Sequence, residues 1–79
     1  MHLLIHLTPP DYDAWKQDFD ANAEARMQAG LTLLQLWRAA GGPGVTALFE
    51  ANDRGRAQAW IDRESATGPD LDARFLKTA

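Results

Sequence analysis

Residues Leu31–Ala51 read LTLLQLWRAAGGPGVTALFEA. Two apolar runs rich in Leu, Val, Phe and Trp flank a short loop of Gly and Pro, which is typical of two antiparallel strands. We therefore expect a β-hairpin here. A third strand is expected at His2–Leu7, a compact apolar run that ends at two consecutive prolines, which stop a ladder of hydrogen bonds.

A first helix is expected between these strands. Asp11 or Asp13 is expected to cap it, and Gly30 stops it after about Ala29. Apolar residues recur every fourth position and should form its inward stripe: Trp15, Phe19, Ala23 and Met27.

A second helix is expected after the hairpin, capped by Asn52 or Asp53 and broken at Gly68. It should bury Ala57, Trp60 and Ile61. The tail around Ala73–Lys77 would form either a short edge strand or a last helical turn, and we favour the strand.

This order predicts an α+β fold of ferredoxin-like βαββα(β) type, one domain spanning residues 1–79 with an antiparallel sheet and two helices on one face. If the purely apolar set of each strand faces the helices, the remaining set lies on the far side: His2, Leu4, His6, Leu33, Gln35, Trp37, Thr46, Leu48 and Glu50. That side is half apolar, and a second copy of the chain is the simplest cover, so we expect a homodimer.

Composition excludes several classes of function. The 79 residues contain no Cys, so disulfides and thiolate chemistry are excluded, and the net charge of -3 argues against nucleic-acid binding. No apolar run is long enough to span a membrane and no signal peptide is recognisable, so a cytoplasmic protein is expected. His2 and His6 stand roughly 13 Å apart on a strand, too far to share a metal ion. No metal or other cofactor is predicted, although haem with His6 as axial ligand stays open.

Several segments resemble the dimeric α/β barrel superfamily: DYDAWKQDFD, the strand ending LWR, the strand and cap VTALFEAND, and a helix ending AW. The likeness is to its small cyclase-like and antibiotic-biosynthesis-monooxygenase-like members. It implies that two sheets pack through their uncovered faces into a barrel, with a pocket within the barrel or between sheet and helices. Activities that it implies include cofactor-independent oxygenation, cyclisation and isomerisation.

His6 is the best candidate for a general base, because it lies on the far face and an imidazole is the side chain most suited to exchange a proton near neutral pH; an ordinary hydrogen-bonded interface histidine is equally compatible. Glu50 is its expected carboxylate partner, or else reaches solvent. The expected walls of a pocket for a flat apolar or aromatic ligand are Leu4, Leu33, Gln35, Trp37 and Leu48. One hypothesis is therefore a cyclase, isomerase or monooxygenase working by proton transfer; the other is a non-catalytic dimer that binds a metabolite or protein partner.

Overall fold

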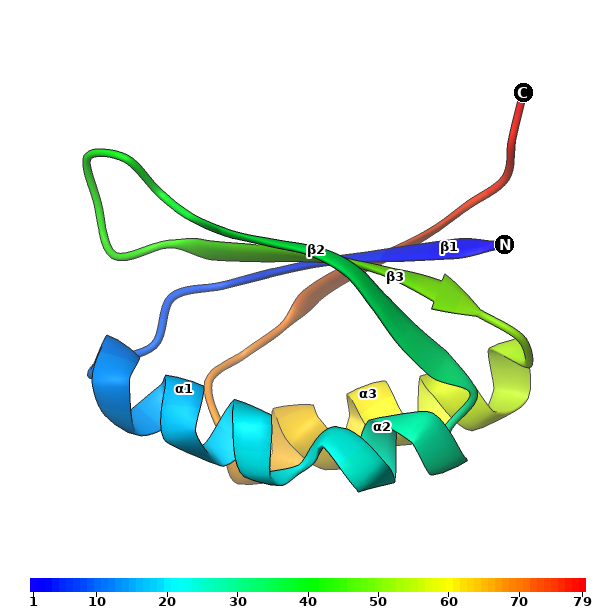
Figure 1. Ribbon diagram of the computed structural model, residues 1–79, viewed down its shortest axis with the longest axis horizontal. Coiled ribbons are helices and arrows are strands. Elements are labelled where there is room, and N and C mark those ends of the chain that lie inside the picture. The colour runs from blue at the N-terminus through cyan, green and yellow to red at the C-terminus, as the bar shows by residue number, and fades with distance from the viewer.

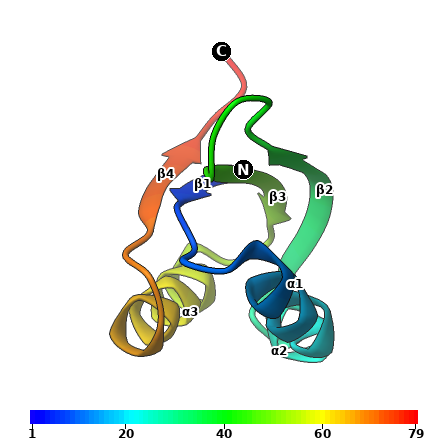
Figure 2. The ribbon, with the colours of Figure 1, turned by 90° about the vertical axis from the view of Figure 1, so that its left-hand side faces the viewer.

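The computed structural model describes residues 1–79 as four strands and three helices. In chain order these are β1 (His2–Leu7), α1 (Tyr12–Ala21), α2 (Ala23–Gln28), β2 (Leu31–Arg38), β3 (Val45–Ala51), α3 (Arg54–Thr67) and β4 (Asp72–Leu76). The strands form one antiparallel sheet in the order β2-β3-β1-β4. All three helices lie on one side of this sheet, and its other side is bare (Figures 1 and 2).

The predicted strands are confirmed. β1 and the β2–β3 hairpin occupy the expected residues, and the C-terminal segment forms a strand rather than a helical turn. β4 pairs with β1 from Asp72 opposite His6 to Leu76 opposite His2. Its helix-facing residues, Ala73 and Phe75, pack against the hydrophobic core. Partly buried and exposed side chains therefore alternate along this short edge strand.

The expected first helix is two helices. α1 begins at the Asp11 cap, whose carboxylate accepts a hydrogen bond from the Ala14 amide, and it ends at Asn22. The Asn22 side chain donates a hydrogen bond of 2.8 Å to the Asp18 carbonyl, and such local hydrogen bonds compete with those of the helix backbone. α2 then begins at Ala23.

The structure corrects the predicted inward stripe of this segment. Phe19 is buried and Trp15 half-buried, as expected, but Ala23 is exposed and Met27 is 69% exposed. The buried side chain of α2 is Arg26, which is only 7% exposed. A strict spacing of four drifts around a helix of 3.6 residues per turn, whereas Arg26 lies about two turns after Phe19 and so shares its side.

The core lies between the sheet and the helices. Its strand residues come from alternate positions of β1 and β3, and α3 contributes Ala57, Trp60 and Ile61 as predicted. An aromatic series crosses it, with Phe49 at its centre, 6.4 Å from the Phe19 ring and 5.7 Å from the Trp60 ring. None of the helices is both long and apolar enough to cross a membrane.

Gly30 joins α2 to β2 with a φ of +75°, where an L side chain is strained. A Cβ there would meet only ordinary contacts, so the cost of Gly30→Ala is conformational. We expect a loss of about 1–2 kcal/mol in the free energy of unfolding, measured by urea denaturation. Gly41→Ala is the control, since a Cβ there meets nothing within 4 Å; equal effects of the two changes would contradict this account.

Candidate functional site

The bare side of the sheet (Figure 2) is called the open face below. The strand registers place its side chains in three rows that run across the strands. Residues directly opposite each other in a ladder share a face, so the registers define the rows. The rows are Trp37–Thr46–His6–Asp72, Gln35–Leu48–Leu4–Arg74 and Thr32–Glu50–His2–Leu76. All the far-face residues predicted from the sequence lie on the open face except Leu33.

A β-bulge moves Leu33 to the other side. Leu33 pairs with Phe49, and the next pair in the ladder is Gln35 with Leu48, so Leu34 is the extra residue. Leu33 therefore shares the helix-facing side of the fully buried Phe49. Strict alternation back from Gln35 would put Leu33 on the open face, and one inserted residue reverses that assignment.

His6 is held at one end of the open face. Its Nδ1 lies 3.1 Å from the Thr46 hydroxyl on β3, which is the ring's hydrogen bond within the chain. Gly44 lies close against the ring, since a Cβ there would come within 3.0 Å of the His6 Cε1. Thr46 and Gly44 thus fix the imidazole on one side and leave Nε2 without a hydrogen-bond partner in the chain.

The carboxylate nearest to His6 in register is Asp72, not the expected Glu50. Asp72 is the β4 partner of His6, whereas Glu50 is paired with His2. Four strand positions separate His6 from that pair, roughly 13 Å. Within one chain, then, the structure does not bring His6 and Glu50 together. Asp72 went unrecognised because its position depends on the register of β4, which has no local signal.

The middle of the open face is apolar. Leu4 and Leu48 lie side by side in the central row, half-buried by their neighbours, with Gln35 and Arg74 at the ends of the row. Trp37 and Leu76 are 47% and 40% exposed on the two edge strands. The surface therefore combines an apolar centre with hydrogen-bonding groups at its margin. The structure has no group of three acidic or histidine side chains that could hold a metal ion.

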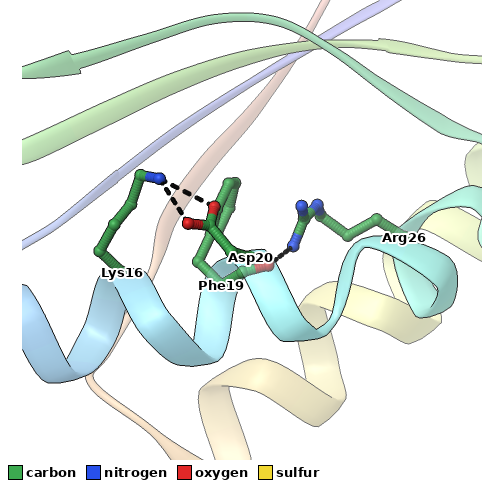
Figure 3. Close-up of polar contacts among 4 residues, drawn as sticks. All are labelled: Lys16, Phe19, Asp20 and Arg26. Carbon is green, nitrogen blue, oxygen red and sulfur yellow. Dashed lines mark hydrogen bonds and ion pairs between the residues drawn. The ribbon is translucent and has the colours of Figure 1, made fainter.

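A second polar cluster lies on the helix side, where Arg26 reaches back from α2 to α1 (Figure 3). Its guanidinium donates a hydrogen bond to the Phe19 carbonyl, which lies in the last turn of α1, where carbonyl groups lack hydrogen-bond donors within the helix. The guanidinium carbon also lies 3.7 Å from the centroid of the Phe19 ring. Burial lowers the pKa of Arg26, and the negative charges of Asp20 and Glu64 oppose that shift. Lys16 bonds both Asp20 oxygens, at 2.7 and 2.8 Å.

Arg26 lines a cleft of about 360 Å³ between the two helical arms of the fold, which are the α1–α2 pair and α3. Trp15 and Phe19 of α1, Trp60 and Glu64 of α3, and Leu71 before β4 form much of its wall. The Trp60 Nε1–H is buried and has no hydrogen-bond partner. Sequence reasoning assigned Trp60 to the core and gave Arg26 no role, because a lone arginine in a polar helix has no pattern that predicts burial.

The fold and these two surfaces define a small α+β protein with one antiparallel sheet that helices cover on one side only. The chain belongs to the family described as domain of unknown function (DUF3303), whose model matches residues 1–63. That match ends within α3, so Asp72 and Arg74 of β4 lie beyond it. A comparison with curated proteins finds no match.

Proposed function

We propose that two copies of the chain pack through their open faces into a dimeric α/β barrel of ferredoxin-like subunits, and that the barrel interior binds a hydrophobic or aromatic small molecule. The observation that carries this proposal is the uncovered apolar centre of the open face, Leu4 and Leu48, with Trp37 and Leu76 beside it. Contiguous exposed apolar patches often mark interaction sites.

A second copy suits this surface for two reasons. The open face carries both signs of charge, with Glu50 and Asp72 against Arg74, so like faces can meet with opposite charges aligned. The chain also has only 15 buried residues among 79. A domain of this size gains stability from burying a further face.

Within such an interior, His6 would act as a general base on the ligand. If the Nδ1–H donates to Thr46, the free Nε2 holds the lone pair that removes a proton. Asp72, the β4 partner of His6, would stabilise the imidazolium that forms on proton transfer, since an adjacent carboxylate stabilises positive charge. Leu4, Leu48 and Trp37 would hold the ligand, and Gln35 would bond a polar group on it. Cyclisation, isomerisation and cofactor-independent oxygenation all begin with such a proton transfer.

A non-catalytic dimer that binds a metabolite is the second candidate. It is favoured by the hydrogen bond that already satisfies the His6 Nδ1 and by the separation of His6 from Glu50. The two candidates share the dimer and the bound ligand. They differ in whether the ligand is transformed.

The dimer is tested by measuring the solution mass by light scattering over a concentration series. The same samples are then screened by thermal shift with flat phenols and polycyclic ketones. A dimer whose melting temperature rises with ligand concentration is the expected result. A stable monomer at high concentration would exclude the barrel and every role assigned to the open face.

His6→Ala separates catalysis from binding. For a ligand that the wild-type protein transforms, we expect the rate to fall about 10²- to 10⁴-fold, because a general base is lost. The exposed ring makes one neutral hydrogen bond, so the free energy of unfolding should change by no more than about 1 kcal/mol. Thr46→Val, which leaves Nε2 in place but removes the bond to Nδ1, should slow the reaction less. An unchanged rate in His6→Ala would leave the non-catalytic dimer as the function.

A further inference from the structure

We propose that the cleft beside Arg26 is a separate binding site, which takes a flat, uncharged molecule bearing a carbonyl oxygen. The cleft lies between the α1–α2 arm and α3, on the helix side of the sheet. It shares no residue with the open face, so this site does not depend on the proposed function.

Hydrogen-bond donors in the cleft wall lack acceptors. An arginine side chain carries five N–H groups, and Arg26, though only 7% exposed, makes one hydrogen bond within the chain, to the Phe19 carbonyl. The buried Nε1–H of Trp60 makes none. Buried donors without partners are costly, and an oxygen atom of a ligand in the cleft would accept a hydrogen bond from the Arg26 guanidinium that lines it.

The charges around the cleft favour an uncharged ligand. Its ionisable lining residues are Arg26, Asp18 and Glu64, which gives one positive and two negative charges and a formal sum of -1. The nearby Asp20 is already bonded to Lys16. A carboxylate or phosphate on the ligand would be attracted by Arg26 but repelled by the two carboxylates. An uncharged carbonyl oxygen is therefore the acceptor that this site accommodates best.

The aromatic part of the cleft wall favours a flat ring. The Trp15 and Phe19 rings stack with centroids 4.9 Å apart and planes inclined by 28°, and Leu7 and Leu71 add aliphatic surface. A volume of about 360 Å³ lies at the small end of the range for small-molecule sites. One or two fused rings with a carbonyl substituent match this combination of walls and donors.

Three probes of one shape test the site: methyl naphthyl ketone, its isopropenyl analogue with a CH₂ in place of the oxygen, and naphthoate. Each is titrated into ¹⁵N-labelled protein while the indole N–H signals of the tryptophans are followed, with Trp60→Phe used to identify the Trp60 signal. We expect the ketone to shift the Trp60 signal and to bind on the order of tenfold or more tightly than the other two.

Arg26→Met removes the guanidinium donors, and Arg63→Met, an exposed change on α3 outside the cleft, is its matched control. Ketone affinity should fall on the order of tenfold in Arg26→Met and stay unchanged in Arg63→Met. Trp60→Phe reduces the aromatic wall of the cleft and should weaken ketone binding as well, which keeps the test decisive if Arg26→Met does not fold. The proposal is overturned if naphthoate binds best, if the isopropenyl analogue equals the ketone, or if the ketone moves only the Trp37 signal or none.

Discussion

Phe49→Ala is expected to lower the free energy of unfolding by about 3–5 kcal/mol. Phe49 is completely buried in the middle of β3, and its ring contacts both helical arms through Phe19 and Trp60. Removing the ring leaves a cavity where the sheet meets both arms. At about 0.05–0.15 kcal/mol per residue, a chain of this length has only about 4–12 kcal/mol to lose.

Urea denaturation followed by circular dichroism, at a fixed protein concentration, measures this loss. Leu34→Ala is the control, because Leu34 is the exposed bulge residue of the edge strand β2, and its loss should cost less than about 1 kcal/mol. A Phe49→Ala protein as stable as Leu34→Ala would show that the sheet and the helices do not share one core through this ring.

Leu48→Glu is expected to convert the proposed dimer to monomer. Leu48 lies at the apolar centre of the open face, next to Leu4, so in a face-to-face dimer the new carboxylate would be buried without a partner. Such a group costs several kcal/mol, which weakens dimerisation by at least about 100-fold. Light scattering over a concentration series measures this change.

Met27→Glu is the matched control for Leu48→Glu, since it adds the same charge at an exposed position on α2, away from the open face. It should leave the mass unchanged. Circular dichroism should show both variants folded, because neither side chain belongs to the buried core. A Leu48→Glu protein that stays dimeric would place the dimer interface, if there is one, on another surface.

The chain's local patterns determine most of its secondary structure. The Gly-Pro-Gly loop between two β-prone runs gives the hairpin, and the paired prolines end β1. Asp11 and Asp53 cap their helices because their carboxylates accept hydrogen bonds from backbone amides. Each of these signals acts over a few residues, so it can be read directly. The burial of Ala57, Trp60 and Ile61 follows in the same way, because α3 is unbroken and keeps one phase.

Tertiary structure decides which side chains meet. Arg26 is buried in place of Met27, and the bulge at Leu34 turns Leu33 away from the open face. The pairing of β4 with β1 sets Asp72 beside His6, while the β1–β3 register sets Glu50 beside His2. Strand register is shifted by a single inserted residue or is set between segments far apart in the chain. For that reason the elements of this protein can be derived from local chemistry, whereas the neighbours of His6 and Arg26 come only from packing.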